Sequence, residues 1–283
     1  MTRRAIKTVL RSDQQRLLAR ANQAAAAVDR HIAAIWDRLL ALVATGPRSA
    51  WFTIFNAARA ALQPLAAIPN MLAANLAEAA RHAHAVTAEN IDDHLPARQL
   101  MEDAASEAAW LAAPLFAAPT LEEIYRLVYA SDWRGRLSAM TRLAAPDALA
   151  AIVANGFQQG LTPAEISRLI RPAVQGVQSS ARRIARTEGM RIAHQTQMEM
   201  YEEIPGVIGY QVHSMHFPAT RHWHAKRDGT IYYRHPKPGQ KGFHQMPRPP
   251  LEADDPGERP AGTPHVAFSC LCWLTPVLGA EQK

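Results

Sequence analysis

The chain has 283 residues, which is enough for two domains with a hydrophobic core. Its hydrophobic fraction of 48% and charged fraction of 20% are typical of globular proteins and argue against a disordered chain, while two cysteines exclude a disulfide framework. The net charge of +6 is modest. We expect neither a signal peptide nor a membrane span, so the sequence predicts a soluble protein made in a reducing cytoplasm.

Residues 1–147 are predicted to form a helical N-terminal region. Ser12-Asp13-Gln14-Gln15 has the pattern of a capping box, and the helix after it is expected to run to about Val43. Further helices are expected over 50–62, 70–84 and 97–111, and another after the capping pattern that begins at Thr120. Alanine is abundant, so each helix buries little area. Both a free-standing bundle and one stabilised by partner subunits fit this composition.

Residues 148–283 are predicted to form a second domain that begins with helices. A short helix is expected from Ala148 to Phe157. Thr162-Pro163-Ala164-Glu165 starts another, because a capping Thr, a first-turn Pro and a Glu at the third position all favour a helix N-terminus. A longer helix is expected from about Ser179 to Glu203, before Pro205-Gly206.

Strand patterns appear only after these helices. Val207–Met215 is expected to be extended, and strands over 223–226 and 230–233 flank Asp228-Gly229, a dipeptide typical of hairpin turns. A terminal strand is expected over 268–277, after a proline-rich loop over 236–264. The predicted fold class is α+β, with a mainly helical N-terminal part and a small C-terminal domain of helices and a short antiparallel sheet.

Three short motifs follow one another in the C-terminal half. They are Arg186-Thr187-Glu188, then Thr220-Arg221-x-x-His224-x-x-x-Asp228-Gly229, and last Cys270-x-Cys272 shortly before a proline. In this order they resemble the phage head morphogenesis family of Mu F-like minor head proteins, over roughly residues 150–280. The resemblance implies that Arg186, Thr187, Glu188, Arg221, His224, Asp228 and Gly229 form a structural motif.

The resemblance also implies a function. It is that of a minor head protein of a tailed phage or prophage, located in the virion, with portal, capsid and scaffold proteins as partners and with no reaction to catalyse. We therefore expect no enzyme. Two other classes stay open: a metal-dependent nuclease or toxin-like hydrolase that uses His222, His224 and Asp228, and a DNA-binding accessory protein.

Glu188 lies four residues from both Ile184 and Ile192, so it shares their apolar helix face. A carboxylate on that face needs a cationic partner, because an unpaired buried charge is costly. Arg191 and Arg221 are the two candidates for that partner. A buried ion pair is the first interpretation of this residue, and a general base or metal ligand is the second.

The only two cysteines raise the question of a metal. In the expected strands, His222 and His224 share one face and Cys270 and Cys272 share another, so the four could bind Zn²⁺ as a Cys₂His₂ set. Many relatives carry an additional upstream Cys-x-x-Cys that this chain lacks, and His265 is a further candidate ligand. The alternative is ordinary buried cysteines and histidines. Apart from zinc, we expect no cofactor.

Basic residues are concentrated in the same region. Residues 182–248 contain eleven Lys and Arg against five Asp and Glu. The candidates for non-specific contact with double-stranded DNA are Arg182, Arg183, Lys226, Arg227 and Lys241. A solvated charged face with no partner is the alternative.

Overall fold

The computed structural model describes residues 3–45, 51–94, 118–142, 146–204, 206–214, 216, 218, 220–249, 260–262, 270 and 272–279. The chain divides into two compact units, each built from separate stretches of sequence. The first unit comprises Met1–Ala21, Leu76–Val128 and Thr187–Lys283, and the second comprises Asn22–Asn75 and Tyr129–Arg186. The domain boundary at residues 147/148 remains a prediction.

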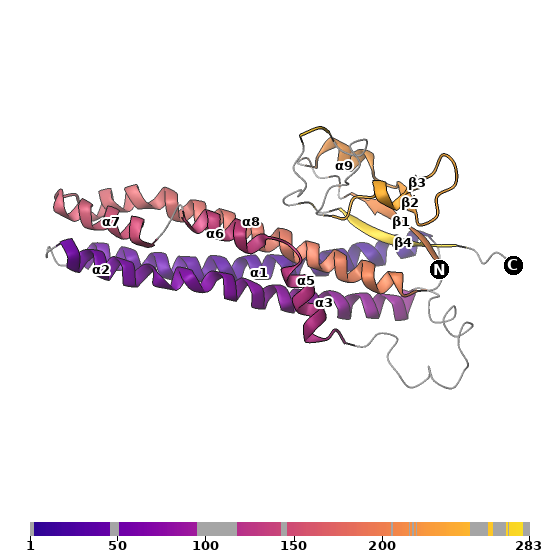
Figure 1. The fold of residues 1–283 in the computed structure, drawn as a ribbon, viewed down its shortest axis with the longest axis horizontal. Coiled ribbons are helices and arrows are strands. Elements are labelled where there is room, and N and C mark those ends of the chain that lie inside the picture. The colour runs from indigo at the N-terminus through magenta and orange to yellow at the C-terminus, as the bar shows by residue number, and fades with distance from the viewer. Residues whose placement is uncertain are drawn as a thin grey trace. The chain divides into compact units, whose positions relative to one another are not determined.

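Helices dominate the described residues (Figure 1). The helices are α1 (Arg3–Thr45), α2 (Trp51–Leu62), α3 (Ile68–His94), α5 (Leu121–Tyr129), α6 (Trp133–Arg142), α7 (Pro146–Gln158), α8 (Pro163–Glu202) and α9 (His222–Lys226), with short 3₁₀ helices over Gln63–Ala67 and Phe243–Gln245. The strands are β1 (Val207–His213), β2 (Ile231–Tyr233), β3 (Lys241–Gly242) and β4 (Trp273–Leu278). No helix within these described residues is both long and apolar enough to cross a bilayer. The helices together with the four C-terminal strands confirm the predicted α+β fold class.

Two of the three helix starts that were predicted from capping residues are present. The Thr120 amide donates to Glu123 Oε2 at 2.7 Å while the Glu123 amide donates to Thr120 Oγ1 at 3.2 Å, and Thr162 and Glu165 repeat the exchange at 2.8 and 3.3 Å. The third prediction was wrong, because α1 is already helical from Arg3 and Ser12 lies within it. The helix expected over 97–111 lies outside the described residues.

Residues 163–202 form one helix, α8, where two were predicted. Pro172 lies inside it and removes one backbone hydrogen bond. The buried stripe nevertheless continues on both sides of the proline, through Ile166, Ile170, Val177 and Ala181. Because these residues keep the three- and four-residue spacing of a single helix face, their packing outweighs the lost bond.

The second unit is a helical assembly around an apolar core. Helix α2 packs against α7, and side chains from α1, α2, α7 and α8 meet around a small apolar cavity. The cavity is lined by Ile32, Ile35, Trp36, Leu62, Leu65, Leu149, Val174 and Val177. Trp133 of α6 is fully buried. Apolar burial is thus the main source of stability in this unit.

The first unit combines helix segments with a four-stranded sheet. Its strand order is β3-β2-β1-β4, with β1 antiparallel to both neighbours and β2 parallel to β3. The sheet is therefore mixed, where a purely antiparallel one was predicted. Met198, Tyr201 and Ile204 at the end of α8 share a core with Tyr210, Val212, Tyr232 and Leu274 of the strands.

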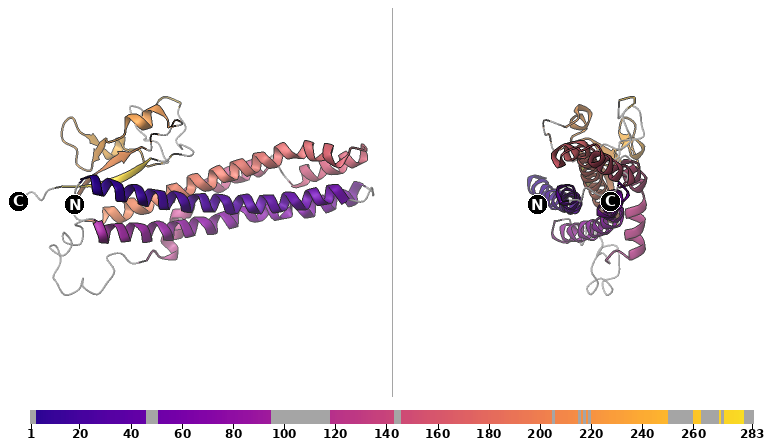
Figure 2. Two further views of the ribbon diagram at one scale, coloured as in Figure 1. Left: turned by 180° about the vertical axis from the view of Figure 1, so that it is seen from behind. Right: turned by 90° about the vertical axis from the view of Figure 1, so that its left-hand side faces the viewer.

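The helix segments of the first unit form a second, smaller contact. Leu17 of α1, Ala83 and Val86 of α3 and Ala193 of α8 form one buried cluster. Figure 2 shows these three helices from two further sides. Gly189 of α8 lies against Ala21 of α1, and a Cβ on this glycine would come within 3.0 Å of the Ala21 Cβ. Small residues therefore permit the close approach of α1 and α8 in this unit.

One strand prediction was wrong. Residues 223–226, expected to be a strand, belong to helix α9, whose first turn closes when the amides of His224 and Ala225 donate to the Arg221 carbonyl. The alternation His222-Trp223-His224 is too short to distinguish a strand from a helix, and this stretch contains no β-branched residue. Asp228-Gly229 consequently ends a helical turn and leads into β2, and the predicted two-residue hairpin is absent there.

Candidate functional site

Three predicted metal-binding residues come together in the first unit. His224 Nδ1 lies 3.3 Å from Cys272 Sγ and 3.5 Å from Cys270 Sγ, and the three candidate ligand atoms all lie within 4.8 Å of one another. Each of these residues is at most 6% exposed. Helix α9 supplies the histidine, and the chain just before β4 supplies the two thiols. The structure therefore forms a buried S₂N cluster, called here the Cys/His cluster.

The Cys/His cluster borders a small cavity. Its walls are Val212, His224, Arg227, Pro247, Pro249, Cys270 and Cys272. Hydrogen bonding with Cys272 and burial together raise the pKa of the Cys270 thiol well above its ordinary value, against the opposing effect of His224. Without a bound cation, this thiol is therefore protonated at neutral pH. Two thiols and an imidazole are ligands that soft and borderline metal ions prefer.

His222 is not in the Cys/His cluster. The residue is exposed, and its ring lies edge-on to Trp223 with centroids 5.3 Å apart. The predicted pairing of His222 with His224 assumed a strand, in which residues two apart share a face. In helix α9 residues two apart differ by about 200°, so the two histidines point away from each other. The further candidate ligand His265 lies outside the described residues.

Glu188 of the Arg-Thr-Glu motif forms a buried ion pair. Of the two predicted partners, the structure has Arg191, whose Nε donates to Glu188 Oε2 at 2.7 Å. The side chains of the two residues are 2% and 5% exposed. Arg191 also donates to the Leu127 carbonyl at 2.7 Å and to Gln195 Oε1 at 3.0 Å. The pair thereby joins α8 to the end of α5.

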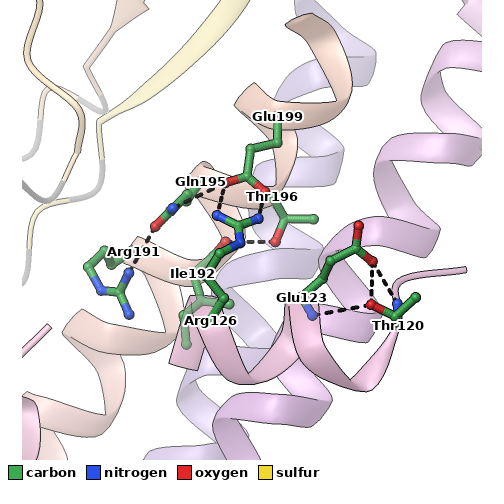
Figure 3. A network of polar contacts seen from close by, with 8 residues as sticks. All are labelled: Thr120, Glu123, Arg126, Arg191, Ile192, Gln195, Thr196 and Glu199. Atoms are coloured by element: carbon green, nitrogen blue, oxygen red, sulfur yellow. Dashed lines mark hydrogen bonds and ion pairs between the residues drawn. The ribbon is translucent and has the colours of Figure 1, made fainter. Parts of the chain in front are cut away.

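A polar network extends this junction along α8 (Figure 3). Arg126 of α5 donates both terminal nitrogens to the Glu199 carboxylate, at 2.9 and 2.8 Å, and Gln195 donates to the same carboxylate at 3.1 Å. Figure 3 shows Gln195 between Arg191 and Glu199. Sequence reasoning missed this network, because Arg126 and Glu199 are 73 residues apart and only the fold brings them together.

Asp228 and Gly229 connect the end of α9 to strand β1. Asp228 accepts from the Ser214 amide and from His216 Nε2, both at 2.9 Å. Burial alone would raise the pKa of the Asp228 carboxyl, but these two hydrogen bonds outweigh burial and lower it. Gly229 has φ of 80°, which favours glycine, and its amide donates to the Val212 carbonyl at 2.8 Å. Both residues therefore hold the backbone in place.

The remaining motif residues differ in burial. Thr187 is 2% exposed, Arg186 is half-buried, and Arg221 is the residue that precedes the first turn of α9. Thr187 lies within the buried face of α8 in the first unit. The structure thus places the predicted motif residues on α8, at the start of α9 and after its end.

His194 is a buried residue that the sequence did not single out. Its Nδ1 donates to the Pro249 carbonyl at 2.8 Å, so in the neutral ring Nε2 is the acceptor, and the Gln14 side-chain nitrogen lies 3.1 Å from it. Burial lowers the pKa of His194 to about 4, although the bond to Pro249 acts in the opposite direction. The ring is therefore neutral at physiological pH and links α1, α8 and the loop that contains Pro249.

The five basic candidates lie in different surroundings. Arg182 pairs with Asp29 at 2.6 Å, and the Lys241 ammonium lies 5.7 Å from the centre of the Tyr232 ring. Arg183 and Lys226 are exposed. Arg227 is only 5% exposed and borders the cavity beside the Cys/His cluster, so it does not contribute to a surface patch.

Comparison with known proteins gives one family match, in the C-terminal half of the chain. Residues 147–275 match the family model described as Phage Mu protein F like protein. This match confirms the family resemblance drawn from the motifs and covers α7, α8, α9 and the first three strands. No curated protein and no solved structure matches the chain significantly.

Proposed function

We propose that the chain is a minor head protein that acts in the head assembly of a tailed phage or prophage and is located in the virion. The observation that carries this proposal is the family match over residues 147–275, because the Mu F-like family is one of phage head morphogenesis. Arg186-Thr187-Glu188 contains one partner of the buried Glu188–Arg191 ion pair, and the other two motifs contribute His224, Cys270 and Cys272 to the Cys/His cluster. The buried ion pair of Glu188 and the hydrogen bonds of Asp228 give these motif residues roles in folding.

The proposed role is structural and not enzymatic. Glu188 is held by Arg191, and both carboxylate oxygens of Asp228 accept hydrogen bonds that fix the chain around β1. His222 is exposed, whereas His224 is buried with the two thiols. These surroundings support packing roles for the residues that the rival nuclease interpretation needs as an acid/base set.

The proposed partners are the portal, the capsid and scaffold proteins, and packaged double-stranded DNA. Fewer basic residues are available for DNA contact than the sequence alone indicated. Of the five basic candidates, Arg227 is buried and Arg182 is paired with Asp29. Arg183 and Lys226 are exposed and Lys241 lies beside the Tyr232 ring, so we keep these three as candidates for DNA contact. Because the sequence has no base-reading motif, their contacts are expected to be indifferent to DNA sequence.

Disruption of the coding sequence in its native phage or prophage tests the head-assembly role. After induction, purified particles are examined by electron microscopy and mass spectrometry. We expect the chain among the proteins of wild-type heads, and fewer or defective heads without it. Intact heads in normal number from the disrupted phage, or wild-type heads that lack the chain, would contradict the proposal.

A salt titration tests the DNA contact separately. Three phosphate contacts give a slope of log affinity against log salt of about −2.7, which is roughly a fortyfold loss between about 50 and 200 mM salt. Two unrelated duplexes should bind equally, and Lys226→Ala should reduce the slope by about one. A strong preference for one duplex, or cleavage of either, would contradict this part of the proposal.

A further inference from the structure

We propose that the Cys/His cluster is a zinc site with three protein ligands: His224 Nδ1, Cys270 Sγ and Cys272 Sγ. A zinc ion with bonds of about 2.3 Å to sulfur and about 2.0–2.1 Å to nitrogen holds tetrahedral S and N ligands about 3.6 Å apart. The two N–S distances in the structure are 3.3 and 3.5 Å. Both N–S distances are therefore already close to the spacing that zinc requires, and all three atoms lie within 4.8 Å of one another.

The chemistry of the surroundings fits the same ion. Thiolate and imidazole ligands in a tetrahedral arrangement are typical of zinc, and carboxylate-preferring ions such as Mg²⁺ find no carboxylate in the cluster. On binding, each thiol releases its proton to solvent and each sulfur donates an electron pair to the metal. Three protein ligands leave the fourth tetrahedral position of the ion open, and the cavity borders both thiols and the imidazole.

A disulfide is the main competing use of the two thiols. Both cysteines are free in the structure. The sequence pattern Cys-x-Cys disfavours such a bond where the backbone is extended, because Cα atoms two residues apart then lie nearly 7 Å from each other, near the upper limit for a disulfide. Metal binding requires no such change, because the imidazole already lies within 3.5 Å of both sulfurs.

The position of the site indicates what the ion would do. His224 precedes the two cysteines by 46 and 48 residues, and the chain between them includes β2, β3 and the proline-rich segment. A zinc ion would tie helix α9 to the start of β4 and close this long connection. Because such binding free energy adds to folding free energy, the ion would stabilise the sheet of the first unit.

Metal titration of the reduced full-length chain tests the proposal. The probes are Co²⁺, whose visible bands report tetrahedral thiolate coordination, and then Zn²⁺, which displaces it. We expect one equivalent of metal per chain, with thiolate-to-cobalt absorption. His224→Ala and Cys272→Ser should each weaken zinc binding by about a hundredfold or more, since loss of an outer-shell group alone costs about 10–100-fold.

His222→Ala is the matched control, because this histidine lies on the same short helix but outside the cluster. Its affinity should equal that of the wild type. Circular dichroism shows whether each variant is folded, and X-ray absorption on the wild-type zinc complex gives the ligand set without any variant. Less than about a tenth of an equivalent of zinc bound by the reduced wild type overturns the proposal, as does a coordination shell without two sulfurs.

Discussion

The two stretches of helix α8 differ sharply in what they bury. In residues 163–186, which belong to the second unit, an apolar stripe is buried and the arginines at 168, 171, 182 and 183 are exposed. In residues 187–202, which belong to the first unit, Glu188, Arg191 and His194 are buried together with the apolar residues. One continuous helix therefore packs in two ways. Its first stretch buries apolar side chains, and its second stretch buries apolar side chains together with paired polar groups.

This difference makes different substitutions costly in the two stretches. A buried ion pair gives little net stability relative to apolar residues, but the loss of one partner leaves the other charge buried and alone. An apolar stripe fails by a different route, through the cavity that a truncated side chain leaves. The following predictions are ordered from the largest expected effect to the smallest.

Glu188→Ala should lower the free energy of unfolding by about 3–5 kcal/mol, because the Arg191 guanidinium then stays buried without its carboxylate. Urea unfolding of the full chain measures this loss. Glu199→Ala is the matched control on the same helix, since the Glu199 side chain is 38% exposed and its pair with Arg126 is screened by solvent. The control should cost no more than about 1 kcal/mol. Equal losses of unfolding free energy in the two variants would contradict the claim that the buried pair matters more than the exposed one.

Ile170→Ala should lower the free energy of unfolding by about 2–5 kcal/mol, because the buried side chain loses apolar contacts and leaves a cavity. Its neighbour Leu169 is 55% exposed, so Leu169→Ala should change stability by no more than about 0.5 kcal/mol. The same unfolding experiment compares them. A large effect of Leu169→Ala would show that this side chain is covered by a partner or another copy.

His194 should make the stability of the first unit depend on pH. Its pKa falls from 6.5 in the unfolded chain to about 4 in the fold, so the folded state favours the neutral ring. The resulting stability is present in full above pH 6.5 and is lost as the pH falls toward 4, by at most about 3 kcal/mol. His194→Gln should flatten this part of the unfolding profile. If the pH dependence of unfolding is the same in the variant as in the wild type, His194 is not its source.

Arg182→Ala should have the smallest effect, no more than about 1 kcal/mol, because more than half of the Arg182 side chain is exposed beside Asp29. Its measured stability should approach the wild-type value as salt is added, since the pair is screened. A loss of several kcal/mol would mean that charge pairs matter as much in the first stretch of α8 as in the second.

The contrast also explains what the sequence predicted well. The apolar stripe of α8 and the capping boxes at Thr120 and Thr162 depend on residues three or four apart, so local spacing was enough to find them. Glu188 was found in the same way, because a carboxylate on an apolar face needs a partner and Arg191 is one turn away. The family motifs added the location of the Mu F-like region, which the family model confirms.

The errors arose where the decisive contacts are distant in sequence. Arg126 and Glu199 are 73 residues apart, and Gln14 and His194 are 180 apart, so no local pattern connects them. The failure at residues 223–226 had a different cause. Alternation over four residues fits both a strand and a helix. A strand would place His222 and His224 on the same face, whereas the observed helix places only His224 beside the thiols. Because residues 222–226 are helical, three of the four predicted metal ligands come together: His224, Cys270 and Cys272.

A double-mutant cycle of Glu188 and Arg191 tests most directly whether the second stretch of α8 depends on paired buried charges. The single variants Glu188→Leu and Arg191→Met and the double variant are compared by urea unfolding. The double variant should be more stable than either single variant, because it leaves no buried charge without a partner, and the coupling should reach about 1–3 kcal/mol. Additive losses, with no coupling between the two positions, would contradict the account.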